Sequence, residues 1–195
     1  MHTTRTSHVD VELLPAAAAR DGDLVGEITG LVNRVYAVAE EGLWVARATR
    51  TTRTEMAEMI GAWQIAVARI DRHIVGAVRI QQLDATKGEF GMLVADPARR
   101  GEGVGRELVT FAEHLTRQRG LAVMQLELLV PREWTHPNKE LLHAWYTRMG
   151  YRPVRSGTID ESYPTLAPLL STPCDFVIYH KELEAQPRQR SPLPR

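Results

Sequence analysis

The chain has 195 residues, of which 44% are hydrophobic and 25% are charged, and its formal net charge is zero. This composition is typical of one globular domain with a substantial core, and the neutral balance argues against a nucleic acid or an anionic membrane as the partner. No apolar run approaches the ~20 residues that cross a bilayer. The single cysteine excludes an intrachain disulfide, and the polar start at Met1–His8 shows no secretory signal, so we expect a cytoplasmic location.

The first half of the chain predicts a strand, two helices and three further strands. We expect, in order, a strand at Val9–Leu14, helices at Leu24–Ala39 and Thr54–Ile60, and strands at Ile65–Ile70, Ile74–Leu83 and Gly88–Ala95. The first helix is predicted from apolar residues at helical spacing, namely Leu24, Ile28, Leu31, Val35 and Val38. Thr52 or Thr54 is placed to cap the second helix.

The second half alternates helices with strands. We expect a helix at Gly105–Arg119, a buried strand at Ala122–Val130, a helix at Lys139–Met149, and strands at Tyr151–Val154 and Cys174–His180. The stretch Arg155–Thr172 has no clear period. The order predicts an α/β fold with a mixed central sheet flanked by helices, forming one domain over residues 9–183, with tails at 1–8 and 186–195 expected to be disordered.

A basic, glycine-rich turn separates the strand that ends before Asp96-Pro97 from the helix that opens at Gly105. Glycines have no Cβ, so the backbone can turn sharply and approach a ligand closely. The free N–H groups of the helix's first turn and the positive end of its dipole favour an anion. The turn is therefore predicted to hold a pyrophosphate through Arg100, Gly101, Glu102, Gly103, Val104, Gly105 and Arg106.

Two motifs narrow the kind of phosphate site. The turn lacks the Gly-Lys-Ser/Thr of a Walker loop and the third glycine of a dinucleotide fingerprint, but it fits R-x-x-G-x-G with Arg100, Gly103 and Gly105. Further on, Tyr146, Gly150 and Tyr151 fit Y-x-x-x-G-[FY]. Together these motifs resemble the two signatures of the GCN5-related N-acetyltransferase (GNAT) superfamily, and the element order is similar from about Val9 to Leu183.

The resemblance implies an acetyl-CoA-dependent N-acetyltransferase that transfers the acetyl group directly to a primary amine in a ternary complex. Acetyl-CoA would lie where two parallel strands splay apart, with its pantetheine paired to backbone near Leu93, Val94 and Ala95. Tyr146 would protonate the departing thiolate; the alternative is a core tyrosine with a satisfied hydroxyl. Asn138 either contacts the cofactor or only caps the following helix.

The base is open among three carboxylates. The family often presents a glutamate at the position of Glu89, acting through a water, and such acid–base help is worth roughly 10²- to 10⁴-fold. Glu127 competes because a carboxylate inside an apolar strand needs a partner or a function. Glu133, at the exit of that strand, is the third candidate.

The acceptor is expected to be a small cationic amine. The resemblance places the loop after the first helix over the substrate, and acidic groups beside aromatic rings suit a cation. The candidate substrate-binding residues are Glu41, Trp44, Glu127, Glu133 and Trp134, with Glu40 beside them. No Cys/His cluster suggests a metal site. A protein N-acetyltransferase and a non-catalytic acyl-CoA-binding module are the alternatives, and homodimers are common in this family.

Overall fold

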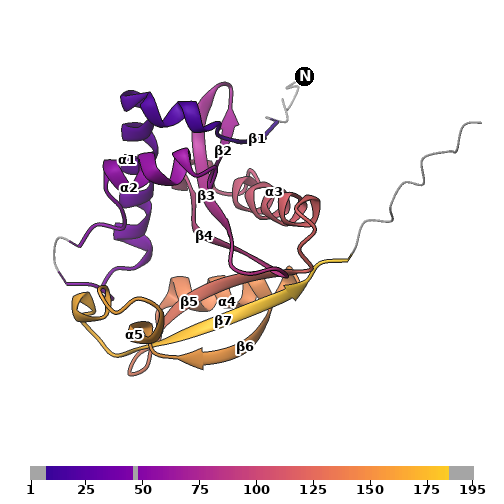
Figure 1. Ribbon diagram of the computed structural model, residues 1–195. Helices are drawn as coiled ribbons and strands as arrows, with labels where there is room; N and C mark the ends of the chain where they lie inside the picture. The colour runs from indigo at the N-terminus through magenta and orange to yellow at the C-terminus, as the bar shows by residue number, and fades with distance from the viewer. Residues whose placement is uncertain (1–7, 46–47, 185–195) are drawn as a thin grey trace, which may run out of the picture.

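The computed structural model describes residues 8–45 and 48–184 (Figure 1). Its strands are β1 (Asp10–Leu13), β2 (Ile65–Ile70), β3 (His73–Gln82), β4 (Lys87–Ala95), β5 (Val123–Pro131), β6 (Arg152–Gly157) and β7 (Cys174–Glu182). Its helices are α1 (Gly22–Ala39), α2 (Arg53–Gly61), α3 (Val104–Gln118), α4 (Pro137–Arg148) and α5 (Ile159–Ser162), with short 3₁₀ turns at Ala16–Arg20, Pro97–Arg99 and Ala167–Leu169. The predicted strands and helices are all present; α5 lies in the stretch that showed no period. The terminal tails predicted to be disordered fall almost wholly outside the described residues.

The strands form one seven-stranded sheet in the order β1-β2-β3-β4-β5-β7-β6. Every neighbouring pair is antiparallel except β4 and β5, which are parallel. Lys87–Glu89 of β4 pair with Val123–Gln125 of β5, and beyond these residues the two nine-residue strands separate. The divergence is visible in Figure 1, where β1–β4 and β5–β7 form two halves of the molecule. The predicted mixed α/β sheet with a splayed parallel pair is confirmed.

A bulge in β4 lies just beyond the paired residues. Met92 and Leu93 stand opposite the single residue Val78 of β3, and Met92 has a φ of 48°. A bulge bends its strand and increases the local twist, which favours the divergence of β4 from β5.

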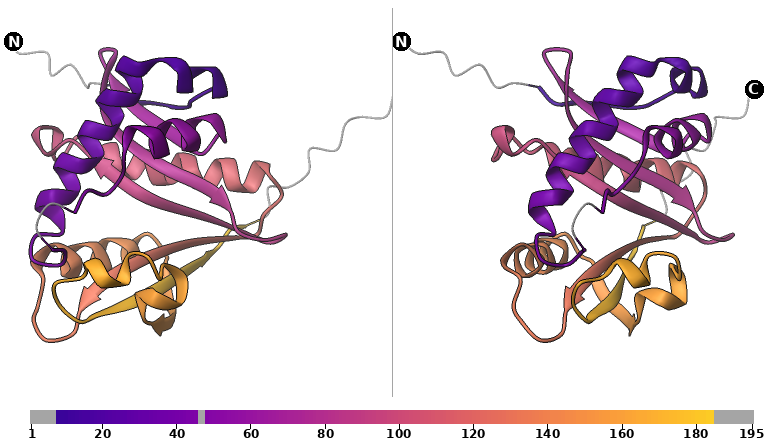
Figure 2. Two further views of the ribbon diagram at one scale, coloured as in Figure 1. Left: turned by 60° about the vertical axis from the view of Figure 1, so that its left-hand side comes forward. Right: turned by 90° about the vertical axis from the view of Figure 1, so that its left-hand side faces the viewer.

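Helices cover both faces of the half that contains β2–β4. The helices α1 and α2 lie on one face and α3 lies on the other (Figure 2). Ile65 and Val67 of β2 pack with α1 and α2, whereas Ala66 and Ala68 pack with α3, as the alternation of side chains along a strand requires. Gly76 of β3 permits close packing of α3, because a Cβ there would lie 2.7 Å from the Cγ1 atom of Val104.

The other half has α4 on one face of β5 and β7, and α5 with its following loop on the other (Figures 1 and 2). Under that loop, a small core cluster joins the end of α1 to this half of the sheet. Its buried members are Leu43, Leu129, Ile159, Cys174 and Phe176. Burial raises the pKa of the Cys174 thiol to about 11, in keeping with the core role expected of a buried cysteine.

Local signals decide two of the helix ends. Thr52, not Thr54, caps α2: its hydroxyl accepts from the N–H of Glu55, whose carboxylate accepts from the N–H of Thr52. This is a capping box. Val38 shares the helical spacing of the other apolar residues of α1 but is 68% exposed. The last turn of α1 instead directs Tyr36 and Glu40 inward, toward the space between the two halves.

Candidate active site

A cleft opens where β4 and β5 separate. This inter-strand cleft has a volume of about 500 Å³, and its lining includes Glu89 and Phe90 of β4, Leu126–Leu129 of β5 and Tyr146 of α4. The β4 backbone that borders it, from Phe90 onward, is not paired with β5. An extended ligand can therefore pair with this exposed strand edge, which includes Leu93, Val94 and Ala95.

The glycine turn lies between β4 and α3 and presents unused backbone donors. Gly101 and Gly103 have φ values of 90° and 84°, and Gly103 is the N-cap of α3. A Cβ at either glycine would meet no described atom within 4 Å. The N–H groups that find no acceptor among the described residues are those of Gly101, Gly103, Val104, Gly105 and Arg106. Open space above several free N–H groups at a helix N-terminus is a suitable site for a phosphate.

The side chains around this turn are exposed, including those of Arg100, Glu102 and Arg106. Glu102 forms an exposed ion pair with Arg99 at 3.5 Å. The turn also packs against α4, because a Cβ on Gly105 would lie 3.6 Å from the Trp145 ring. The Trp145 ring in turn contacts Tyr146, with 5.0 Å between the two ring centroids.

Glu89 is a buried carboxylate in the inter-strand cleft. It lies directly opposite Gln81 of β3 and is only 6% exposed. Burial and the nearby Glu127 carboxylate together raise the pKa of Glu89 to about 7, against the opposing effects of Gln81 and Arg79. A carboxylate with a pKa near neutrality can take up and release a proton at physiological pH, as a general base requires.

Glu127 lies beside Glu89 but is more heavily hydrogen-bonded. Its carboxylate accepts from the Tyr163 hydroxyl at 2.9 Å and from the Gln125 amide at 3.3 Å. Burial raises the pKa of Glu127, while the two hydrogen bonds and Arg50 lower it. Both carboxylates line the cleft, and burial raises the pKa of each.

Tyr146 lies on α4 at the other wall of the cleft and is 6% exposed. Its ring packs against Phe90 at a centroid distance of 6.0 Å. No described residue accepts a hydrogen bond from its hydroxyl, and the hydroxyl oxygen is not among the fully enclosed, unpaired side-chain atoms of the described residues. Burial raises the pKa of Tyr146 well above the ordinary 10.0, so the phenol stays protonated and can donate into the cleft.

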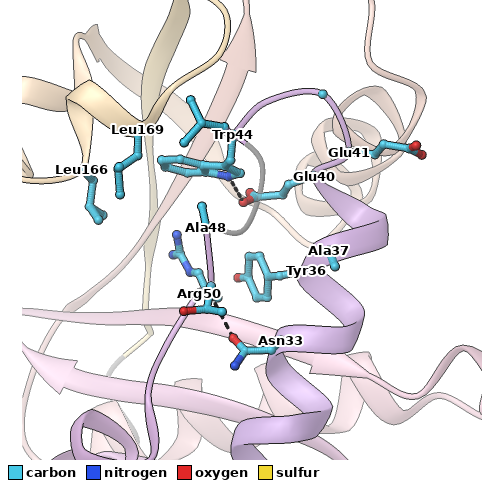
Figure 3. A pocket seen from close by; sticks show the side chains of 13 residues that line it. Asn33, Tyr36, Ala37, Glu40, Glu41, Trp44, Ala48, Arg50, Leu166 and Leu169 are labelled. Carbon is cyan, nitrogen blue, oxygen red and sulfur yellow. Dashed lines mark hydrogen bonds between the residues drawn. The ribbon is translucent and has the colours of Figure 1, made fainter.

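A second pocket adjoins the cleft at the end of α1 (Figure 3). This side pocket has a volume of about 250 Å³ and shares residues of its lining with the inter-strand cleft. The shared residues are Tyr36, Glu40, Trp44, Arg50 and Leu166. Two candidates for the acceptor site, Glu41 and Trp44, line this pocket.

Glu40 is engaged in holding the two halves together. Its carboxylate accepts from Lys139 Nζ of α4 at 2.6 Å and from Trp44 Nε1 at 2.6 Å. The Lys139 and Glu40 side chains are 4% and 8% exposed. Burial alone would raise the pKa of Glu40, but Lys139 and Arg50 hold it below its ordinary value. Glu40 is therefore an ionised, fully paired carboxylate.

Three candidates lie outside both pockets. Glu133 and Trp134 are exposed on the loop between β5 and α4, where Trp134 donates to Thr172 Oγ1 at 3.3 Å. Asn138 is exposed in the first turn of α4. The prediction that Asn138 caps α4 is wrong: the helix begins at Pro137, and His136 Nδ1 accepts from the N–H of Asn138 at 3.2 Å. Proline at the first helical position explains the earlier start.

The sequence analysis missed several polar residues of the site. Arg79 and Gln81 line up on the face of β3 next to Glu89, and Arg79 donates to Gln81 at 2.8 Å. Their spacing could have indicated them, because two polar residues two positions apart in an apolar strand lie on the same face of the sheet. Tyr36 and Arg50 also face the site, and Arg50, in a loop, had no such signal.

Two further observations concern the described part of the chain, residues 8–45 and 48–184. None of its helices combines the length and the apolar character needed to cross a membrane. It also contains no group of three or more His, Cys, Asp or Glu side chains arranged to hold a metal ion.

The fold is shared by solved acetyltransferase structures. An aminoglycoside 6′-N-acetyltransferase complexed with coenzyme A is 15% identical, with a TM-score of 0.66 over 91% of this chain and 99% of that one. The ribosomal-protein-S18-alanine N-acetyltransferase of Escherichia coli is 14% identical, with a TM-score of 0.63 over 94% and 99%. N-acetylglutamate synthase of Neisseria gonorrhoeae is 14% identical, with a TM-score of 0.60, and the match spans 91% of this chain but 36% of that one.

Sequence comparison matches part of the chain to a family model. No curated protein sequence matches the chain significantly. Residues 61–153 match the family model described as an acetyltransferase (GNAT) domain, and this range contains the splayed strands, the glycine turn and Tyr146. Residues 61–153 therefore match a GNAT acetyltransferase domain, and the fold of the chain is the one found in solved acetyltransferase structures.

Proposed function

We propose that the protein transfers the acetyl group of acetyl-CoA to the primary amine of a small molecule. One observation carries the proposal: Glu89, Tyr146 and the unpaired edge of β4 up to Leu93 border one cleft, and β4 leads directly into the glycine turn with its free N–H groups. A phosphate site, a strand edge, a base and an acid are the parts that acyl transfer from a CoA thioester needs.

The described residues fit acetyl-CoA. Its pyrophosphate would accept from the N–H groups between Gly101 and Arg106, where the glycines leave room, and its pantetheine amides would pair with the β4 edge near Leu93–Ala95. When bound, it supplies an acetyl group on a good leaving group, since a thiol has a pKa near 8.5. Asn138 stays a predicted further contact.

Glu89 and Tyr146 would carry the proton transfers. The ammonium group of the acceptor first releases one proton through a water to the Glu89 carboxylate, which passes it to solvent. As the resulting neutral amine attacks the thioester carbonyl carbon, the nitrogen loses its second proton by the same route. The carbon–sulfur bond then breaks, and the Tyr146 hydroxyl gives its proton to the departing sulfur. Solvent afterwards removes the proton from Glu89 and restores the one on Tyr146. The neutral phenol and the carboxylate with a pKa of about 7 are in the protonation states that these two roles require at pH 7–8.

The side pocket is the proposed acceptor site. Its volume of about 250 Å³ is below the roughly 300–1,000 Å³ of sites for drug-sized ligands, which favours a small amine over a protein. An amine arrives as an ammonium cation, and the neighbouring carboxylates of Glu89 and Glu127 would attract it. A cytoplasmic location and a homodimer stay predictions from the sequence.

A thiol-release assay tests the proposed function. The protein is incubated with acetyl-CoA and a panel of small primary amines, and free CoA thiol is measured. We expect amine-dependent release. A non-catalytic acyl-CoA-binding module would instead show ligand stabilisation, about 2.7 kcal/mol at 100 times the dissociation constant, without any release of thiol.

A further inference from the structure

An arginine stands in the side pocket on a loop that α1 holds in place. Asn33 of α1 accepts from the N–H groups of Arg50 and Thr51 at 3.0 and 3.1 Å, and it donates to the Thr51 carbonyl at 2.9 Å. These hydrogen bonds fix the backbone at Arg50. Figure 3 shows its side chain extending into the pocket between Tyr36 and the apolar residues Leu166 and Leu169.

The guanidinium of Arg50 has no carboxylate partner in the described part of the chain, whose ion pairs do not include it. It lies over the Tyr36 ring, with its central carbon 4.7 Å from the ring centroid. The nearby Glu40 carboxylate already accepts two hydrogen bonds from Lys139 and Trp44. Arg50 lines open pocket space, so an anion that enters the pocket can reach the guanidinium.

Charged and apolar groups lie close together around the pocket. Arg50 lines both the side pocket and the inter-strand cleft and acts on the Glu127 carboxylate, which neighbours Glu89 in the cleft. Trp44, Leu166 and Leu169 supply apolar walls. A molecule complementary to this arrangement has an anionic group for Arg50, an adjacent ammonium group for the carboxylates, and an apolar side chain for the walls.

Planar guanidinium groups bind carboxylates through two parallel hydrogen bonds. We propose, on the basis of the function proposed above, that the acceptor is an amino acid with an apolar side chain, and that Arg50 binds its carboxylate. Arg50 is then a specificity-determining residue, because it selects among amines without touching the reacting atoms.

Matched acceptors test the role of Arg50. Thiol release is measured with L-leucine against 3-methylbutylamine, and with L-phenylalanine against 2-phenylethylamine; within each pair the two molecules differ by the carboxylate. A charge-assisted hydrogen bond corresponds to a factor of about 10 to 100 in affinity. We expect Arg50→Gln to lower kcat/KM for the amino acids by about that factor more than for the matching plain amines, with the difference mainly in KM. Arg50→Lys should retain part of the preference, because a point charge lacks the paired donors.

Arg34→Gln is the control, since Arg34 is an exposed arginine of α1 outside both pockets. Equal losses with both members of a pair, or a wild-type preference for the plain amine, would overturn the proposal. Leucyl-leucine, which keeps a free amine and a free carboxylate, separates a free amino acid from a peptide as the acceptor.

A binding measurement distinguishes a failure of the Arg50 proposal from a failure of the proposed acetyl transfer. N-acetyl-L-leucine and N-acetyl-3-methylbutylamine are titrated calorimetrically into wild-type protein and Arg50→Gln. Tighter binding of the carboxylate by wild type alone supports the role of Arg50, even if no amine releases thiol and the proposed function fails. Equal binding of the two compounds by wild type refutes the role of Arg50, even if thiol release is observed.

Discussion

Replacing Glu89 by glutamine should remove most of the activity and at the same time stabilise the fold at neutral and basic pH. Glu89 is 6% exposed, and burial with the neighbouring Glu127 raises its pKa from 4.5 to about 7. A tenfold change in proton affinity is worth about 1.4 kcal/mol. The carboxylate in its ionised form therefore costs the folded state about 3 kcal/mol, a cost that a neutral amide of the same shape does not have.

The pH dependence follows from the proton balance. Below about pH 4.5 Glu89 is protonated in both the folded and the unfolded chain, and it contributes nothing. Between about 4.5 and 7 the unfolded chain has released the proton while the folded chain keeps it, so stability falls as pH rises. Above about pH 7 both states are ionised and the full cost is present. The gain from Glu89→Gln should therefore be small at pH 4.5 and approach ~3 kcal/mol at pH 8.

Urea unfolding of wild type and Glu89→Gln at both pH values measures this difference. Glu27→Gln, an exposed position on the same fold, should change stability at neither pH. In the thiol-release assay, loss of a general base predicts a decrease in kcat/KM of roughly 10²- to 10⁴-fold. A stability gain that does not grow with pH would contradict the burial argument, and near-wild-type turnover would refute the role of Glu89 as the base.

Four further outcomes are expected. Glu127→Gln removes a negative charge beside Glu89, so the rise of kcat/KM with pH, set by Glu89 near 7, should move to lower pH. An unchanged pH profile would show that Glu127 does not influence the group that sets the rise. Tyr146→Phe should lower kcat while leaving the acetyl-CoA affinity measured by calorimetry intact, and unchanged kcat would exclude it as the acid. Gly103→Val should abolish acetyl-CoA binding, whereas Gly120→Val, with a similar φ of 77° and open surroundings, should not; retained binding by the first would contradict the phosphate site. Lys139→Met leaves Glu40 buried without its cation and should cost about 3–5 kcal/mol in urea unfolding, whereas Arg132→Met, from an exposed pair with Asp175, should cost under ~1 kcal/mol.

The parts of the fold that could be predicted depend on short-range signals. The capping box of Thr52 and Glu55, the glycines that begin α3 and the alternation along β1 are each contained in a few consecutive residues. The glycine turn could be predicted as an anion site because the features that favour an anion, missing Cβ atoms and free N–H groups, are local properties. Tyr146 and Glu89 were placed on their elements by the same kind of pattern, together with the family resemblance.

The parts that could not be predicted depend on contacts between distant residues. Glu40 and Lys139 are 99 positions apart, and nothing near Glu40 in the sequence indicates that its charge is neutralised by α4. The loop that carries Arg50 has no period, and its position depends on Asn33 of the preceding helix. Val38 has the right spacing for the core, but the end of α1 extends past the core that its earlier turns cover.

The geometry of the cleft follows from how the two halves of the sheet are joined at its ends. At the closed end, β4 and β5 pair over three residues each, and Phe90 packs against Tyr146 and Tyr151 at centroid distances of 6.0 and 5.7 Å. At the open end, the buried pair of Glu40 and Lys139 ties α1 to α4. Contacts at both ends hold the walls that carry Glu89 and Tyr146 apart without a ligand, so the groups proposed to react need little rearrangement when substrates bind. Such preorganisation is a main source of catalytic power. An apolar pair could replace a buried ion pair without loss of stability. The ion pair suits this position because its directional hydrogen bonds set the distance between α1 and α4, which apolar contacts would leave less well defined.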